Sequence, residues 1–324
     1  MPDAHPPCAF PAFLQPWIDR FYTPMEIRLL QVLEKQNLSG TRIKQQLELD
    51  LPEDFFERVW RRGVVNRLAD GRFAPADFHD RFEKWALFEG WQDLPLEIKT
   101  QLNQWELDDY IERHRNRVAC LKAGQSRPTD KVCPEYLLLD EVDRLFQRIP
   151  RFYLWPCNCR AMIEGCGHSR LTCIRFSNDR GIGWEISRER ALAIVGEANR
   201  QGLMQSAELA VDDQGRFDGA LCNCCSDCCF PHQLATRLQA GKVWPLSRYL
   251  ANQPSASCNG CGRCVRRCPF DAISQERKAK GQPAATPVIA SDLCRGCGIC
   301  ATGCPQEAIL MQRIGESPME AYYA

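Results

Sequence analysis

A cysteine motif that occurs twice near the C-terminal end constrains this chain more than any other feature. The sequence reads CNGCGRCVRRCPFDAI from Cys258 and CRGCGICATGCPQEAI from Cys294, so both copies follow the pattern C-x2-C-x2-C-x3-C-P. Three thiolates at this spacing wrap one loop around three irons of a cubane cluster, while the fourth faces away and ligates a second cluster. The repeat therefore predicts two [4Fe-4S] clusters that share interleaved loops.

This interleaving assigns four cysteines to each cluster. One set is Cys258, Cys261, Cys264 and Cys304, and the other is Cys294, Cys297, Cys300 and Cys268. Glycines inside both motifs let the backbone turn tightly enough to aim N–H groups at cluster sulfurs. Two structural zinc ribbons are the alternative interpretation, but zinc sites require neither the third cysteine at this spacing nor the proline that follows the fourth. The pattern thus favours iron–sulfur clusters.

The region that carries these motifs, about residues 251–314, closely resembles the bacterial dicluster ferredoxins. The resemblance implies two small ββα-like halves related by a pseudo-twofold axis. It also implies two clusters close enough for rapid electron hopping.

Composition sets the context for these cysteines. The chain has 324 residues and 20 cysteines, with 41 Lys plus Arg against 41 Asp plus Glu, so it carries no excess positive charge for a nucleic acid or an anionic membrane. The sequence shows neither a membrane-spanning apolar run nor a signal peptide, so we expect a cytoplasmic protein. Reducing thiol pools disfavour disulfides there, and metal binding is the better interpretation of so many cysteines.

A second cysteine population lies in the middle of the chain. The segments PCNCRAMIEGCGHSRLTC and LCNCCSDCCF contribute nine residues: Cys157, Cys159, Cys166, Cys173, Cys222, Cys224, Cys225, Cys228 and Cys229. We expect an amphipathic helix over residues 135–148, a strand RFYLW before Cys157, a helix capped by Ser187, and a hairpin that turns at residues 213–215 and delivers Cys222. Both cysteine groups would then sit just past a strand.

We expect these nine cysteines to bind a metal of their own, either a third iron–sulfur cluster or zinc. The alternative is a set of buried free thiols, but two adjacent cysteine pairs in two tight groups are hard to explain by packing alone. Cys157, Cys159, Cys222 and Cys224 are the first candidates, and the number of sites is open. His168 is a weaker candidate for a nitrogen ligand, whereas Cys8, Cys120 and Cys133 stand alone.

The upstream motifs add a second resemblance. The succession P-C-N-C-R, G-C-G-H, T-C and C-N-C-C ahead of two ferredoxin motifs is similar to a group of uncharacterised 4Fe-4S dicluster proteins common in anaerobic bacteria, over about residues 130–314. This resemblance implies a role in anaerobic metabolism but names no reaction.

The N-terminal third has the pattern of a winged helix. Thr23-Pro24 can open one helix, Ser39 can cap a second, a third starts at Pro52, and VVNRL, Asp70-Gly71 and RFAP suggest a hairpin. Acidic residues open the third helix where a DNA reader would approach phosphates: Glu53, Asp54 and Glu57. Protein contact or scaffolding is therefore favoured over DNA binding. The later series Arg113, Arg115 and Arg117 is interpreted as a solvated face.

Together these features predict an α+β multidomain chain. Its parts are an N-terminal extension (1–20), a helical winged-helix-like domain (21–125), a Cys-rich α+β domain with a possible extra metal site (126–250), a 2[4Fe-4S] ferredoxin-type domain (251–315) and a tail (316–324).

The leading functional hypothesis is an iron–sulfur electron-transfer protein that passes single electrons through two [4Fe-4S] clusters to or from a redox partner protein. Two alternatives stay open: a redox-sensing winged-helix transcriptional regulator, and an oxidoreductase subunit that uses the middle Cys-rich metal site. An electron carrier or oxidoreductase subunit is favoured over a stand-alone enzyme, because no substrate or nucleotide motif is evident.

Overall fold

The computed structural model describes residues 10–48, 51–125, 133–163, 166–212, 215–276 and 284–322, and it mixes helices with strands as an α+β chain does. Two compact units are present. One runs to residue 106 and includes residues 179–182, and the other comprises residues 107–178 and 183–324. Helix α6 (Leu96–Lys122) continues from the first unit into the second. Among the helices that these ranges cover, none combines the length and apolar character needed to cross a bilayer.

The first unit is built of short helices and one hairpin around an aromatic core. Its elements are η1 (Ala12–Trp17), α1 (Ile18–Phe21), α2 (Pro24–Leu33), α3 (Gly40–Leu47), α4 (Phe55–Arg61), β1 (Val65–Arg67), β2 (Phe73–Pro75), α5 (Phe78–Phe88), η2 (Trp91–Asp93) and the first part of α6. Phe21, Phe82, Trp85 and Trp91 are all buried, so large rings fill the space between the helices.

The helix caps expected from the sequence are present at the starts of α2 and α3. Thr23 and Glu26 form the capping box of α2, and Ser39 accepts the backbone N–H of Arg42 at the start of α3. The third helix begins at Phe55 rather than Pro52, because the Phe55 N–H closes a turn on the Pro52 carbonyl before the helix starts. The hairpin β1–β2 lies at the expected residues.

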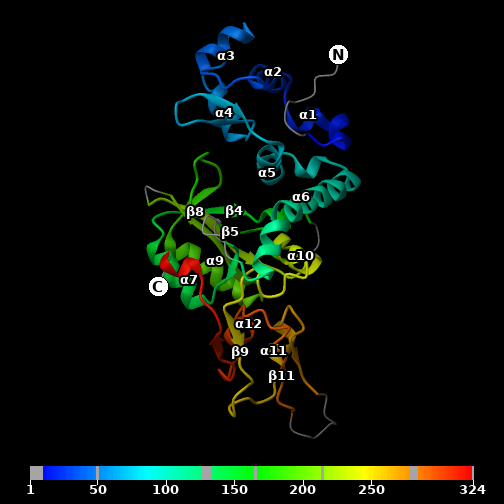
Figure 1. The fold of residues 1–324 in the computed structure, drawn as a ribbon, viewed down its shortest axis with the longest axis vertical. Coiled ribbons are helices and arrows are strands. Elements are labelled where there is room, and N and C mark those ends of the chain that lie inside the picture. Colours follow the sequence, from blue (N-terminus) through cyan, green and yellow to red (C-terminus); the bar gives the residue numbers. More distant parts are fainter. Residues whose placement is uncertain are drawn as a thin grey trace. The chain divides into compact units, whose positions relative to one another are not determined.

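The second unit is organised by a six-stranded antiparallel sheet with the order β3-β7-β8-β5-β4-β6. Its elements are β3 (Glu135–Tyr136), α7 (Leu139–Arg148), β4 (Phe152–Pro156), α8 (Asn158–Ala161), β5 (Leu171–Arg175), β6 (Trp184–Ile186), α9 (Arg188–Arg200), β7 (Met204–Val211), β8 (Phe217–Cys224) and α10 (Phe230–Arg237). Figure 1 shows α7 and α9 next to each other on this sheet.

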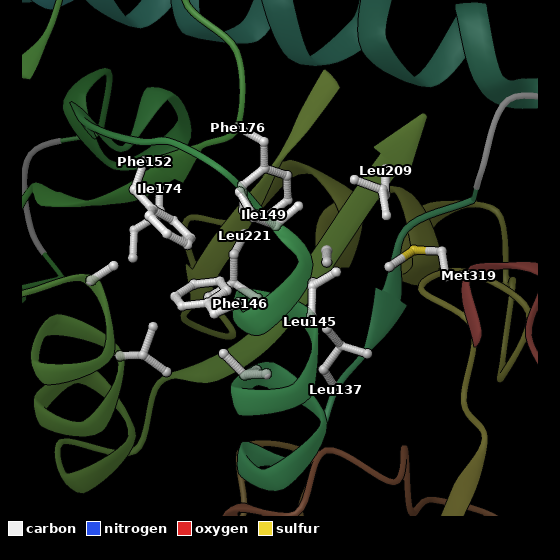
Figure 2. Packing of buried hydrophobic residues seen from close by; sticks show 14 residues of the cluster. Leu137, Leu145, Phe146, Ile149, Phe152, Ile174, Phe176, Leu209, Leu221 and Met319 are labelled. Carbon is white, nitrogen blue, oxygen red and sulfur yellow. The ribbon is translucent and has the colours of Figure 1, made fainter. Parts of the chain in front are cut away.

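Helices α7 and α9 cover one face of the sheet and form its apolar core. Leu145 and Phe146 of α7 point toward Ile174 of β5 and Leu221 of β8, which are paired across the two strands (Figure 2). Met319, from the short helix η3 (Pro318–Tyr322), is fully buried in the same cluster. Helix η3 is therefore packed onto the apolar core of the six-stranded sheet.

Two expectations for this region need correction. The predicted helix over residues 135–148 begins only at Leu139, because Glu135 and Tyr136 pair with β7 as a strand. The predicted hairpin is present, but β8 continues through Cys224, so Cys222 lies inside a strand rather than past its end. Asp213 and Gln214 of the expected turn lie outside the described residues.

The part of the second unit that carries the doubled motif has two small sheets and two short helices. Its elements are β9 (Tyr249–Ala251), α11 (Arg263–Arg267), β10 (Ile273–Ser274), β11 (Val288–Ile289), α12 (Ile299–Thr302) and β12 (Met311–Arg313). Strand β9 pairs with β12, β10 pairs with β11, and α11 packs against α12. Each motif thus contributes one loop and one helical turn to a shared core (Figure 1).

Candidate metal centres

The doubled motif builds two hollows, each lined by four cysteines. The first is lined by Cys268, Cys294, Cys297 and Cys300. The second is lined by Cys258, Cys261, Cys264 and Cys304. Each set takes three cysteines from one motif and the last cysteine from the other. The structure therefore brings together the same two sets that the spacing predicts, although their role as ligands stays a prediction.

Backbone conformation explains how the loops deliver three cysteines to one hollow. Gly262 and Gly298 occupy equivalent positions as the N-caps of α11 and α12, with φ angles of 67° and 75°. This left-handed conformation is strained for residues with a Cβ atom. The glycine lets the loop of each motif reverse between its second and third cysteines, so both thiols face the same hollow.

The electrostatics of the first hollow favour a bound cation. Burial, with the nearby thiols of Cys294 and Cys268, raises the pKa of Cys300 to about 12. Burial also raises the pKa of Cys297, and the nearby thiols of Cys300, Cys268 and Cys294 raise it further. Neighbouring thiols ionise together only when positive charge lies between them, because thiolates repel one another in a low dielectric. Four thiolate donors around an enclosed space fit an iron–sulfur cluster, whose irons are each held by a cysteine.

The nine middle cysteines separate into two groups. We call the larger group the six-thiol group. Its members interact through thiol–thiol hydrogen bonds and close electrostatic contacts. They are Cys157, Cys159, Cys173, Cys222, Cys224 and Cys229. The smaller, which we call the Cys166 group, contains Cys166, Cys225, Asp227 and Cys228. The four residues predicted first as ligands, Cys157, Cys159, Cys222 and Cys224, all lie in the six-thiol group.

Strand alternation explains the position of the six-thiol group. Leu221 of β8 and Ile174 of β5 face the apolar core, so their neighbours Cys222 and Cys173 point to the opposite face of the sheet. Cys224 lies two residues beyond Cys222 and therefore shares its face. Cys157 follows β4 directly and is the N-cap of α8. The sheet thus presents hydrocarbon on one side and thiols on the other.

The thiols of this group share their protons unequally. Hydrogen bonds from Cys173 and Cys224 lower the pKa of Cys222 well below its usual range, and a hydrogen bond from Cys159 lowers the pKa of Cys157. The donor thiols show the opposite shift, so the pKa of Cys173 is raised by its bond to Cys222 and by burial. The six thiols therefore titrate as a linked set rather than independently.

Arg160 of the P-C-N-C-R motif lies between the two middle groups and is buried. Its guanidinium donates hydrogen bonds to the Thr172 hydroxyl (3.0 Å) and the Asn223 carbonyl (2.8 Å). Burial opposes its charge, but Cys157, Cys225 and Cys166 raise the pKa of Arg160 above its usual range. One buried cation thus faces thiols of both groups, a role that the sequence patterns did not single out.

The ferredoxin part and the six-thiol group meet in one buried cluster. Cys297, which lines the first hollow, packs with Cys224 and Cys229 around Tyr136. The Tyr136 ring also lies 6.1 Å from that of Phe270, which lines the same hollow. The two thiol-rich sites are therefore separated by a thin layer of buried side chains.

The remaining predicted positions lie apart from these sites. Cys133 points its thiol toward the Val243 carbonyl (3.5 Å), burial raises its pKa to about 12, and Cys120 lies on α6. His168 is not one of the four residues of the Cys166 group. Cys8 lies outside the described residues.

The arginine series on α6 is a solvated face only in part. Arg113 and Arg115 are exposed and pair with acidic residues of their own helix, as that interpretation requires. Arg117 is partly buried instead, with its guanidinium 5.6 Å from the centre of the Trp244 ring.

The arginines at the end of the candidate recognition helix α4 and on the following strand β1 are already paired with acids. Arg61 and Arg67 both bind Glu57 (2.8 and 2.6 Å). Arg62 binds the buried Glu26 (2.6 Å) and also Glu89 (3.0 Å). Their charge is neutralised where a phosphate would have to approach.

Comparison with known protein families agrees with the C-terminal geometry. The C-terminal cysteine sets described above support iron–sulfur cluster binding. A family model described as 4Fe-4S dicluster domain matches residues 257–308, which include both motifs and all eight cysteines that line the hollows. No curated protein matches the chain.

Proposed function

We propose that this chain transfers single electrons between a redox partner protein and two [4Fe-4S] clusters held in its C-terminal part. The observation that carries the proposal is the pair of hollows, each lined by four cysteines drawn from both motifs. A cubane held by four thiolates accepts and releases one electron at a time without needing a substrate site.

The residues of each hollow would hold and insulate the bound group. Three cysteines of the first hollow are buried, and Ile289 and Ile299 line it with apolar surface. In the second hollow the Ala308 N–H donates to the Cys304 sulfur (3.3 Å), a contact that stabilises negative charge on that thiolate. Cys261 is exposed, so the second hollow offers the shorter route to a partner at the surface.

A second candidate function is an oxidoreductase subunit in which the middle cysteines hold a further redox centre. The presence of Cys297, Cys224 and Cys229 in one buried cluster favours it, because electrons would pass from the first hollow to the six-thiol group through only a few buried side chains. Six thiols exceed the four thiolates that one [4Fe-4S] cluster requires, so the group can supply the complete ligand set of a further cluster.

The third candidate, a redox-sensing regulator that binds DNA, is disfavoured. Helices α2, α3 and α4 and the hairpin β1–β2 have the order of a winged helix. However, Arg61, Arg62 and Arg67, at the end of α4 and on β1, are held in acid pairs, which reduces the positive charge available there for phosphate contacts. Protein contact or scaffolding is the role we propose for this unit.

The test of the ligand sets is the metal content of single variants of the full chain, purified without oxygen. Cys261→Ala should damage one cluster and destabilise the other, since the two share interleaved loops, so iron and sulfide should fall together. Cys133→Ala is the matched control, because Cys133 lines neither hollow. An unchanged iron content in Cys261→Ala would contradict the proposal.

A further inference from the structure

The Cys166 group is a compact set of four ligand atoms. The sulfurs of Cys166, Cys225 and Cys228 and a carboxylate oxygen of Asp227 all lie within 4.8 Å of one another. A tetrahedral zinc ion with Zn–S bonds of 2.3 Å places its sulfurs about 3.8 Å apart, so only small shifts separate this group from a closed zinc site. A cubane spreads its ligands over four separate irons and therefore needs them farther apart.

We propose that Cys166, Cys225, Asp227 and Cys228 form a mononuclear zinc site, separate from the six-thiol group. The inference deepens the proposed metal-binding role of the middle cysteines by dividing them between two sites of different chemistry. Zinc is the metal that three thiolates and one carboxylate select in tetrahedral geometry, since it accepts both donor types and imposes no other shape.

The loop that carries three of the ligands is fixed in a ligand-presenting conformation. The Cys228 N–H donates to the Cys225 sulfur (3.4 Å) and to the Asp227 carboxylate (3.0 Å), which holds the C-x-x-C turn closed. Gln233 of α10 donates to the carbonyl of Asp227 (3.2 Å). The fourth ligand, Cys166, comes from the segment after α8, so an ion here would join two parts of the chain that are distant in sequence.

The surroundings match a structural ion. Cys225 and Cys228 are buried and pack with Ala198 and Leu203, while Cys166 and Ile163 pack against the same cluster. The Arg160 guanidinium lies beside Cys225 and Cys166. Its positive charge would offset part of the net negative charge of a zinc ion bound by four anionic ligands. The ion would tie the end of β8 and the start of α10 to the loop after α8.

Elemental analysis of the full chain, purified without oxygen in zinc-containing medium, tests this inference. We expect one zinc per chain in addition to iron. The double variant Cys225→Ser/Cys228→Ser should lose the zinc and keep its iron, sulfide and reduced-state EPR signals. Cys173→Ser, which changes the six-thiol group, should keep the zinc.

Zinc X-ray absorption on the unaltered protein keeps the inference testable if the double variant fails to fold. The expected environment is three sulfurs near 2.3 Å and one oxygen near 2.0–2.2 Å. Absence of zinc, zinc retained by the double variant, or loss of iron and sulfide together with zinc would overturn the site. An iron-free protein would instead contradict the proposed electron-transfer function, so the two failures are distinguishable.

Discussion

The Arg248 guanidinium and the Glu141 carboxylate form a two-pronged ion pair in which both side chains are shielded from solvent. Nη1 and Nη2 of Arg248 each lie 2.8 Å from an oxygen of Glu141. The exposed fractions of the two side chains are 0% and 1%. Tyr249 also donates its hydroxyl to Glu141 (2.8 Å), and Arg248 binds Glu320 (3.0 Å). The pair thus joins helix α7, the start of β9 and the C-terminal helix η3.

Arg248→Met should be strongly destabilising, because it leaves the Glu141 carboxylate buried without its cation. Removing one partner of such a pair costs about 3–5 kcal/mol in the free energy of unfolding. The control is Arg151→Met, whose partner Glu185 is largely exposed and whose pair is worth only about 0–1 kcal/mol. Denaturant unfolding of both variants measures the difference, and equal losses would show that burial of the Arg248 pair is unimportant.

Gly296→Ala should impair metal loading of the first hollow. A Cβ atom at this position would lie 2.1 Å from the Tyr249 carbonyl oxygen, and the φ angle of 68° is strained for alanine. The loop between Cys294 and Cys297 would therefore have to shift, so the iron content should fall toward half of the unaltered value. Gly315→Ala is the control, since nothing lies within 4 Å of its added Cβ. Full iron content in Gly296→Ala would refute this account of the loop.

His114 should make the second unit less stable in mild acid. Burial, together with Arg113 and Arg117, lowers the pKa of His114 to about 4, whereas the unfolded value is near 6.5. Between these values the unfolded chain binds a proton that the folded chain does not. Its contribution to stability is therefore complete above about pH 6.5 and declines as the pH falls toward 4.

Unfolding temperatures measured between pH 8 and pH 5 check this prediction. His114→Phe, which keeps a ring against Tyr110 and Trp244, should show a smaller loss of stability over that range. Identical pH profiles of the two proteins would mean that His114 does not contribute.

The protein should not bind DNA beyond ordinary non-specific contact, with dissociation constants no tighter than ~10⁻⁴ to 10⁻⁶ M at physiological salt. The reason is the acid pairing of the arginines at the end of α4, above all that of the C-cap residue Arg62 with the buried Glu26. Fluorescence anisotropy with labelled DNA measures the dissociation constants of the metal-loaded and metal-free proteins. Nanomolar, sequence-dependent binding by either form would favour the regulator instead.

Features encoded by neighbouring residues were predictable from the sequence. The caps at Thr23, Ser39 and Ser187 depend on side chains within three residues of the N–H groups that they bind, and each marks a helix in the structure. The grouping of the motif cysteines was also predictable, because the spacing within each motif is itself the geometric constraint.

Features that depend on distant residues were not predictable. Cys166 meets Cys225 and Cys228 only because the loop after α8 and the end of β8 converge, and nothing near Cys166 in sequence indicates this. Likewise, the sequence pattern places Glu135 and Tyr136 in an amphipathic helix, whereas in the structure they pair with strand β7. Asp227 does carry a local signal, since it lies inside the C-x-x-C pair of Cys225 and Cys228.

EPR-monitored redox titration of the full chain, purified without oxygen, tests the central claim most directly. If two [4Fe-4S] clusters occupy the hollows lined by Cys294 and Cys258, stepwise reduction should take up at least two single electrons per chain. The reduced protein should show spin-½ signals broadened by magnetic interaction between neighbouring clusters. A protein whose C-terminal cysteines hold zinc, or whose reduced form shows no such signal, would contradict the account.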